Sequence, residues 1–498
     1  MNNILPYILQ QFIQPINFVF LVVGSIIGII FGAIPGLSGA LAVMLVLPLT
    51  YTMSTGSAII LLISLWAGGT SGSFIGSILL GIPGSPSSVA TCFDGYKMTL
   101  KGQTNKALSI GMTASFIGNV GGILIAWLLS EKIASFAFKF GPWEYFGLCF
   151  MAITLVIGLS RENVFKGLAS AFLGLLMTCT GFSPIDGVQR FTFGSYYLVG
   201  GFSLFAVLMG VFGLSQILTD LGLGNYTSAK PVETQKKRGL DLSIKEILKE
   251  WVNIVRSFLI GLWIGFLPGL GPGLSNLVAY SAAKNSSKHP ETFGTGDPSG
   301  LWASETSNNA SIGGALIPMS ALGIPGDTVT AILIGALAVH GLQMGPMIFR
   351  NSGHIIYLMF ATVLVAAIVI YLIEIFTMKY YSAILKIPHY YLYPALAMLL
   401  MINAYVDSNN LFNAVLMLIF AIVGIIMSMG KLPTSPFILA FVLGPTLESN
   451  MLKSFQYSNS VLTFFTRPLS AIFLLIGIIS IIYPPVQSLL KKRRLQVA

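Results

Sequence analysis

Four glycines that each follow a proline mark the places where this sequence could build a binding site: Gly36, Gly84, Gly269 and Gly326. Each Pro-Gly step interrupts an apolar stretch, and such a step breaks a helix. The next helix then begins with N–H groups that lack intrahelical partners and carry partial positive charge. An anion can bind to these N–H groups without any lysine or arginine. Unwound carbonyls and hydroxyls beside the same breaks could hold Na⁺.

Small residues, many of them polar, follow these breaks and would complete such a site. The candidate substrate-binding residues are Pro35, Gly36, Ser38, Gly39, Gly84, Ser85, Ser87, Ser88, Gly269, Gly271, Ser275, Asn276, Gly326 and Thr328. Taken singly, each has an ordinary structural explanation, because serine and threonine cap helices and glycine beside proline forms turns. Their symmetric placement in an apolar protein favours a binding site.

Five acidic, amide and hydroxyl residues are candidates for ion coupling: Asp327, Glu305, Asn308, Asn309 and Thr330. Ionisable groups inside apolar stretches are costly and usually functional. Asp327 lies at a break with no basic residue nearby in the sequence, so it could ligate Na⁺, accept a proton or cap a helix. Glu305 could equally be a capping residue or an ion ligand.

The composition indicates that the chain, including these breaks, folds in a lipid bilayer. The chain has 498 residues, of which 55% are hydrophobic and 9% charged, whereas soluble domains carry about 25% charged residues. Asp94 is the first charged residue and, like Glu448, is expected at the membrane interface. We therefore expect an all-α polytopic membrane protein with about 10 to 14 membrane segments, including broken helices or hairpins.

Apolar runs of about 20 residues predict the spanning helices. The clear ones cover 107–130, 143–160, 163–182, 196–218, 353–378, 411–429 and 468–484, with shorter ones at 390–404 and 433–449. Glycine and proline interrupt four more, at 16–55, 57–82, 251–283 and 305–345. Such breaks are tolerated only inside protein or beside a water-filled cavity.

No motif points to an enzyme or to a bound cofactor. The four histidines and three cysteines are scattered without metal-ligand spacing, and no GxxxxGK[ST] loop is present. The net charge of +10 fits basic cytoplasmic loops in a bilayer, and no basic patch alternates with aromatic residues as in a nucleic-acid groove. We expect no catalytic residues, no metal beyond Na⁺, and no cofactor other than co-transported Na⁺ or H⁺.

Two motifs recur in the same order and divide the chain into halves. The pattern G-x3-G-x2-P-G-L begins at Gly28 and again at Gly261, and GIPG begins at Gly81 and again at Gly323. The expected divisions are a first transmembrane half at 1–224, a cytoplasmic linker with a short amphipathic helix at 225–250, a second half at 251–484 and a basic cytoplasmic tail at 485–498.

The basic residues of the loops predict opposite orientations for the two halves. Lys97, Lys101 and Lys106 follow the first GIPG and place that loop in the cytoplasm. Counting spans back from the basic tail places Arg350, after the second GIPG, outside. The N-terminus is then external and the C-terminus cytoplasmic. Inverted repeats with discontinuous helices are the recurring plan of secondary transporters.

The motifs resemble those of the large membrane subunit of the tripartite tricarboxylate transporters, the TctA family. The similar stretches are 24–50, 81–110, 265–273, 304–346, 443–450 and 467–470. The resemblance implies a subunit of the bacterial inner membrane that works with a small four-helix membrane subunit and a periplasmic solute-binding protein. It also implies import of a small di- or tricarboxylate, driven by a Na⁺ or H⁺ gradient instead of ATP.

One departure from the family pattern lies before the second GIPG, where the family reads close to PEAANNA. This chain reads SETSNNA, and the hydroxyls of Ser304, Thr306 and Ser307 either alter which carboxylate fits or cap the helix.

An anion channel remains an alternative, as does a membrane-embedded scaffold or enzyme without transport. A channel would show no dependence on a second ion, and a scaffold would tolerate mutation of the glycine breaks.

Overall fold

The computed structural model describes residues 4–158, 164–183, 185–222 and 240–497, without the side chains of His389 and 487–497. The helices before the linker are α1 (Ile4–Ile13), α2 (Pro15–Ala33), α3 (Gly39–Val46), α4 (Thr55–Leu80), α5 (Val89–Leu100), α6 (Thr104–Ala137), α7 (Pro142–Gly158), α8 (Val164–Thr178), α9 (Leu204–Leu208) and α10 (Ser215–Gly222). The later helices are α11 (Ile244–Lys249), α12 (Trp251–Phe266), α13 (Gly271–Ser286), α14 (Pro298–Leu322), α15 (Thr328–Val339), α16 (Ile348–Asn351), α17 (Gly353–Thr377), α18 (Tyr381–Ile384), α19 (His389–Val406), α20 (Leu411–Met429), α21 (Thr434–Tyr457), α22 (Thr463–Thr466) and α23 (Pro468–Val497). Short 3-10 or π turns are η1 (Leu47–Thr52), η2 (Pro86–Ser88), η3 (Tyr196–Leu198), η4 (Met209–Leu214), η5 (Pro290–Thr292) and η6 (Met378–Tyr380), and the strands β1 (Gly181–Phe182) and β2 (Gln189–Arg190) pair antiparallel.

Seven helical stretches in the described part of the chain are long and apolar enough to cross a membrane. They are Pro15–Ala33, Thr55–Leu80, Thr104–Ala137, Leu204–Gly222, Gly353–Ile384, Leu411–Met429 and Pro468–Val486. Apolar helices of 10–17 residues lie between them, and α12 and α15 at the predicted breaks are among these. Because helices of this length and composition require a bilayer, the chain is an all-α polytopic membrane protein.

The span predicted at 196–218 begins later than its apolar run suggests. Residues Tyr196–Leu198 form the 3-10 turn η3, and Gly201 adopts a φ of +81°. The helix starts only at Leu204, where Ser203 accepts a hydrogen bond from a backbone N–H as N-cap. A glycine with positive φ interrupts regular helix, so hydropathy alone overestimated this span.

Two stretches that were expected to be broken contain long continuous helices. α4 has no break between Thr55 and Leu80, and α14 continues through Pro318. Both helices are almost wholly buried, so packing against neighbouring helices outweighs the low helix propensity of their glycines. Their breaks lie at the C-terminal ends, where Gly81 and Gly323 adopt left-handed conformations.

The chain folds into two compact units, and each draws on both halves of the sequence. Unit 1 combines Met1–Ala134 with Ile217–Asn403, and unit 2 combines Ser135–Gln216 with Ala404–Ala498. All four predicted breaks belong to unit 1. In unit 2, α7 packs against α21 and α23, and α8 packs against α21.

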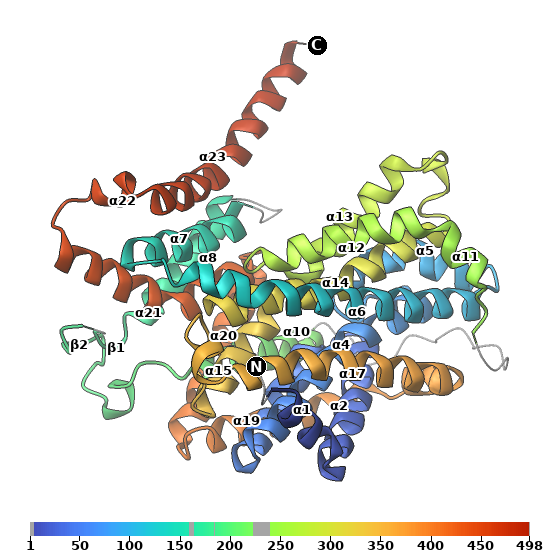
Figure 1. Cartoon of the computed structure of the whole chain (residues 1–498), viewed down its shortest axis with the longest axis horizontal. Coiled ribbons are helices and arrows are strands. Elements are labelled where there is room, and N and C mark those ends of the chain that lie inside the picture. The colour runs from blue at the N-terminus through green and yellow to red at the C-terminus, as the bar shows by residue number, and fades with distance from the viewer. Residues whose placement is uncertain (1–3, 159–163, 184, 223–239, 498) are drawn as a thin grey trace. The chain divides into compact units, whose positions relative to one another are not determined.

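Unit 1 contains the same helix pair twice. α2 lies along α4 in the first copy, and α12 lies along α14 in the second (Figure 1). Gly32 allows the first approach, because a Cβ atom there would lie 2.2 Å from the carbonyl oxygen of Gly69. Gly265 allows the second, with the carbonyl oxygen of Ser311 at 2.4 Å. Glycines at equivalent positions of the repeated motif thus have equivalent roles, whereas the orientation of the copies across the bilayer stays a prediction.

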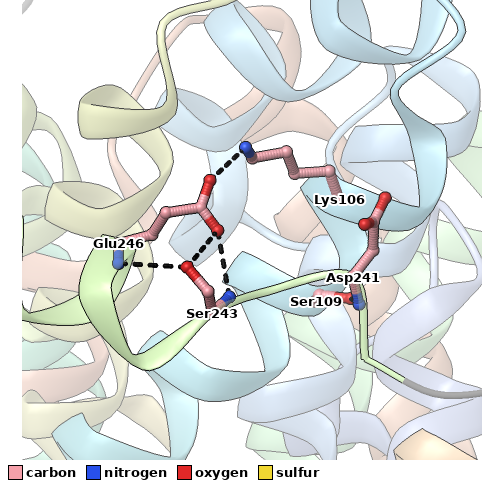
Figure 2. Close-up of polar contacts among 5 residues, drawn as sticks. All are labelled: Lys106, Ser109, Asp241, Ser243 and Glu246. Carbon is pink, nitrogen blue, oxygen red and sulfur yellow. Dashed lines mark hydrogen bonds and ion pairs between the residues drawn. The ribbon is translucent and has the colours of Figure 1, made fainter.

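The described end of the linker is attached to the first turns of α6. Ser243 forms a capping box with Glu246 at the start of α11. Glu246 also forms an ion pair with Lys106 (Figure 2). The backbone N–H of Asp241 donates to Ser109 Oγ at 2.9 Å. A short helix, Ile244–Lys249, thus lies at the end of the predicted linker, and residues 225–239 lie outside the described residues.

Candidate functional site

The first break, between α2 and α3, requires glycine at position 36. Gly36 has a φ of +84°, in the left-handed region that other residues avoid. A Cβ atom there would also lie 2.7 Å from Tyr393 Oη and 2.9 Å from Asp220 Oδ2. Ser38 then caps α3 by accepting a hydrogen bond from the N–H of Leu41 at 3.2 Å. This break is therefore held by conformation, capping and close contact with two polar groups.

The glycines of the two GIPG sequences occupy equivalent places. A Cβ atom at Gly84 would lie 2.1 Å from the carbonyl oxygen of Gly32, at the end of α2. A Cβ atom at Gly326 would lie 2.8 Å from the carbonyl oxygen of Gly265, at the end of α12. The GIPG break of each copy therefore packs against the helix that precedes the other break of that copy. Gly84 lies against α2, and Gly326 lies against α12.

The residue after each GIPG begins a capping box. Ser85 forms one with Ser88 before α5, and Asp327 forms one with Thr330 before α15. The N–H of Thr330 donates to Asp327 Oδ1 at 2.8 Å, and the N–H of Asp327 donates to Thr330 Oγ1 at 2.8 Å. Asp327 thus caps a helix, which is one of the three roles that the sequence left open. Its roles as Na⁺ ligand or proton acceptor stay predictions.

The third and fourth breaks lie against each other. Gly269 and Gly271 both have positive φ, at +72° and +55°. A Cβ atom at Gly271 would approach Asp327 Cβ to 2.9 Å. Thr328 follows as the first residue of α15 and is half-buried. The start of α13 and the start of α15 are therefore neighbours.

Glu305 lies fully buried in the middle of α14. Its Oε1 accepts a hydrogen bond from the hydroxyl of Thr91. Its Oε2 accepts from Asn308 Nδ2 at 3.3 Å and from Ser115 Oγ at 3.4 Å. All three donors are neutral, and no ion pair to Glu305 occurs in the described part of the chain. A buried carboxyl group without a basic partner is suited to bind a proton or a small cation.

Asn309 ties α14 to two other helices around Glu305. Its Nδ2 donates to Ser115 Oγ of α6 at 2.8 Å. Its Oδ1 accepts from Ser71 Oγ of α4 at 2.9 Å and from Asn119 Nδ2 of α6 at 3.1 Å. Both polar atoms of the Asn309 side chain therefore have hydrogen-bond partners, whereas Asn308 Oδ1 has none among the described residues.

A continuous series of hydrogen bonds joins Glu305 to the serines of the first GIPG loop. Asn308 Nδ2 contacts both Glu305 Oε2 at 3.3 Å and Ser73 Oγ at 3.4 Å. Ser87 Oγ donates to Ser73 Oγ at 3.4 Å, and Ser85 Oγ lies 2.5 Å from Ser87 Oγ. The structure thus brings predicted ion-coupling and substrate-binding residues into one polar cluster.

Residues of α13 complete this cluster. Asn276 Nδ2 donates to the carbonyl oxygen of Pro86 at 3.2 Å, and Ser275 Oγ donates to the carbonyl oxygen of Ser307 at 3.4 Å. Buried polar atoms normally have hydrogen-bond partners. Among the described residues, Asn276 Oδ1, Ser307 Oγ and Asn308 Oδ1 have none. Two neighbouring helices, α13 and α14, therefore present buried polar atoms that a ligand could contact.

The first break contacts α4 instead of the polar part of α14. A Cβ atom at Gly39 would lie 3.2 Å from Gly69 Cα, and Pro35 lies near Gly76. No hydrogen bond joins this break to Glu305 in the ranges that the structure describes. Like the capping box of Asp327 and Thr330 at the fourth break, the first break therefore has no hydrogen bond to the cluster among the described residues.

The sequence interpretation missed five polar residues of the cluster, which are Ser71 and Ser73 of α4, Thr91 of α5, and Ser115 and Asn119 of α6. Ser115 and Asn119 are four residues apart, so they share one face of a helix. Two polar residues with that spacing in an otherwise apolar run were the available signal.

Asp94, expected at the membrane interface, is buried inside unit 1. Its Oδ1 accepts hydrogen bonds from the backbone N–H groups of Gly294, Gly296 and Asp297 at 2.8, 2.7 and 2.8 Å. Its Oδ2 accepts from the hydroxyl of Tyr280 at 2.8 Å. The loop before α14, which belongs to the second copy, thus folds onto α5 of the first copy. The sequence could not show this contact because the partners lie about two hundred residues apart.

The breaks and the polar cluster lie inside the region that a family model matches. That model is described as the tripartite tricarboxylate transporter TctA family, and it covers residues 18–439. The chain belongs to this family. As a TctA-family protein it is a multi-pass membrane subunit of a tricarboxylate transporter.

Two curated relatives of this TctA-family chain come from Agrobacterium vitis. An uncharacterized 52.8 kDa protein in the TAR-I ttuC' 3' region is 30% identical over 482 residues, which cover 97% of this chain and 95% of the relative. An uncharacterized protein in the TAR-II ttuC' 3' region is 30% identical over 234 residues, which cover 47% of this chain and 97% of the relative. No solved structure gives a significant match.

Proposed function

We propose that this TctA-family chain is the large subunit of a secondary transporter that imports a small di- or tricarboxylate, driven by a Na⁺ or H⁺ gradient. The proposed partners are a small four-helix membrane subunit and a periplasmic solute-binding protein, in the inner membrane of a bacterium. The observation that carries the proposal is the buried series of hydrogen bonds from Glu305 to Ser85. It joins an acidic group to donors that lie beside a helix start.

The donors in this series suit an anionic substrate. The hydroxyls of Ser85 and Ser87 and the N–H groups at the start of the following helix can donate to a carboxylate. Glu305 would repel that anion unless it carried a proton or a cation. A carboxylate and a cation bound along one series therefore stabilise each other, and the coupling is reciprocal. This mutual stabilisation is the energetic basis that symport needs.

The test is uptake of radiolabelled citrate and related carboxylates into vesicles that hold the chain, its small partner and the binding protein. Uptake is compared under an inward Na⁺ gradient, an inward H⁺ gradient and no gradient. Gradient-driven accumulation that requires the binding protein would support the proposal. Equilibration indifferent to both gradients would indicate an anion channel. Absence of flux with every carboxylate would favour a scaffold or an enzyme.

Ser87→Ala tests the site within the same assay. We expect uptake at subsaturating substrate to fall about tenfold, since a hydrogen bond to a charged group contributes about 1.5–3 kcal/mol. Ser281→Ala is the matched control, because Ser281 is exposed on α13 and donates only to the carbonyl oxygen of Leu277. Wild-type uptake by the Ser87 variant would remove this residue from the substrate site.

A further inference from the structure

A second carboxyl group lies buried in unit 1, and the proposed site does not use it. Glu374 lies near the C-terminal end of α17 and is 1% exposed. Its Oε1 has no hydrogen-bond partner. Within α17 it is the only Asp, Glu, Lys or Arg, in a run that otherwise reads as an ordinary apolar span. Buried ionisable groups of membrane spans are costly, and their presence points to function.

α6 contacts both the helix of Glu374 and the helix of Glu305. Tyr371, one turn before Glu374, has its hydroxyl oxygen 3.3 Å from Thr113 Oγ1 of α6. Ser115, two residues further along α6, donates to Glu305 Oε2 at 3.4 Å. Both carboxyl groups are buried in unit 1, where water screens charges poorly and like charges repel each other. The charge state of one therefore affects the other.

No basic side chain forms an ion pair or hydrogen bond with the Glu374 carboxyl group in the described residues. α2 and α4, which pack against α17, contain no Asp, Glu, Lys, Arg or His. Close to the Glu374 end of α17, Tyr381 of α18 donates its hydroxyl to the carbonyl oxygen of Glu374 at 3.2 Å, and Lys379 of η6 lies over the ring of Tyr380. Near the start of α17 lie His354 with Tyr7 of α1, Arg350 of α16, and Glu131 of α6, which accepts from Tyr357. The other ionisable groups are Lys106 of α6, which pairs with Glu246, and Glu305 of α14. Glu305 and Glu131 bear the same charge as Glu374.

The surroundings of the Glu374 carboxyl group limit which ion it can bind. An ionised carboxylate that is buried without a countercharge costs several kcal/mol. A metal cation takes several oxygen ligands, whereas Glu374 Oε1 has no hydrogen-bond partner. A proton needs one oxygen only. The surroundings of Glu374 therefore suit a proton.

We propose that Glu374 is a proton-binding site of the transporter and that its proton is linked to the charge of Glu305. This inference rests on the proposed function and deepens it, because it names H⁺ as an ion that moves with the carboxylate. When both groups are ionised they repel each other, and a proton on Glu374 removes that repulsion. A bound carboxylate adds a further negative charge and so strengthens proton binding at Glu374, which makes the proton and the carboxylate bind and leave together.

Glu374→Gln tests the proposal in vesicles, since glutamine resembles the protonated acid but cannot release a proton. We expect accumulation driven by an inward H⁺ gradient to fall at least tenfold. Exchange of labelled for unlabelled carboxylate should persist and lose its dependence on pH. Glu131→Gln is the control, because Glu131 is an exposed carboxyl group of α6 that accepts a hydrogen bond from Tyr357 at 2.5 Å. Wild-type H⁺-driven accumulation by the Glu374 variant would overturn the proposal.

A measurement on the wild-type protein does not depend on how the variant folds. Dicyclohexylcarbodiimide reacts with protonated carboxyl groups in apolar surroundings, and mass spectrometry locates the adduct. We expect an adduct at Glu374 that decreases from acidic to alkaline pH, as the carboxyl group loses its proton. No adduct at either acidic or alkaline pH would overturn the proposal. If wild-type vesicles exchange no carboxylate, the proposed function fails, whereas the labelling still decides whether Glu374 binds a proton.

Discussion

Helix capping and ligand binding both use polar side chains at the helix starts of this protein. Ser85 and Asp327 both cap helices, yet only Ser85 also contacts the polar cluster, through Ser87. A capping oxygen accepts from the helix, while a serine hydroxyl can still donate elsewhere. The sequence could therefore identify the positions of the breaks, but the difference between a cap and a ligand depends on neighbours from other helices.

Asp94 offers a prediction at the same scale. Asp94→Ala would leave three backbone N–H groups and the Tyr280 hydroxyl without their acceptor. Each unsatisfied buried group costs about 1–3 kcal/mol, so we expect a loss of several kcal/mol and a clearly lower unfolding temperature in detergent. Differential scanning fluorimetry measures the change.

Two variants give this measurement its controls. Asp94→Asn keeps one carbonyl oxygen as acceptor, so we expect it to lose less stability than the alanine variant. Glu291→Ala removes an exposed carboxylate that pairs with His289 in the same loop, and it should leave the unfolding temperature unchanged. An Asp94→Ala protein as stable as the wild type would show that the loop does not depend on this aspartate.

Among the elements, long apolar runs were predictable and tertiary contacts were not. α7, α17 and α20 begin and end within a few residues of their predicted spans, since a bilayer requires a fixed length of apolar helix. The continuity of α4 could not be predicted, because neighbouring helices and not its own residues stabilise it. Glu374 was missed although it is the only Asp, Glu, Lys or Arg of α17, which was the available signal in the sequence. Its lack of a basic partner depends on which helices surround α17.

The attachment of α11 to α6 leads to a prediction about pH. A hydrogen bond from Lys106, followed by one from the backbone of Ser243, lowers the pKa of Glu246 from 4.5 to about 2. Because the pKa is lower in the docked state, this contribution is complete above pH 4.5 and is lost as the pH falls towards 2. The pair is partly exposed, so it contributes about 0.2–1 kcal/mol.

A nitroxide attached at exposed position 245 reports the attachment, after Lys245→Cys and removal of the native cysteines. We expect its mobility to rise as the pH falls from about 4.5 towards 2 and Glu246 becomes protonated. With Glu246→Gln the label should be mobile throughout. A wild-type label whose mobility stays constant over this range would show that the ion pair does not hold α11.

For the whole molecule, composition decided the fold class, and the repeated motif corresponds to a helix pair that occurs twice in unit 1. Neither could show that unit 1 and unit 2 each combine segments from both halves of the chain. Such a division depends on contacts between segments that are distant in the chain, and local sequence patterns do not predict these contacts. The repeat therefore describes how helices pair, while the units describe which parts of the chain pack together.

The proposed inversion of the two halves has a direct test at this scale. Gln103 follows α5 in the first copy, Gln343 follows α15 in the second, and both side chains are exposed. If the halves are inverted, the two positions face opposite sides of the membrane, with Gln103 in the cytoplasm. In a protein without its native cysteines, a membrane-impermeant maleimide should label Gln343→Cys in intact cells and Gln103→Cys only after permeabilisation. Labelling of both from the same side would mean that the copies are parallel. The breaks would then not face each other across the membrane, and the paired helices would need another functional explanation.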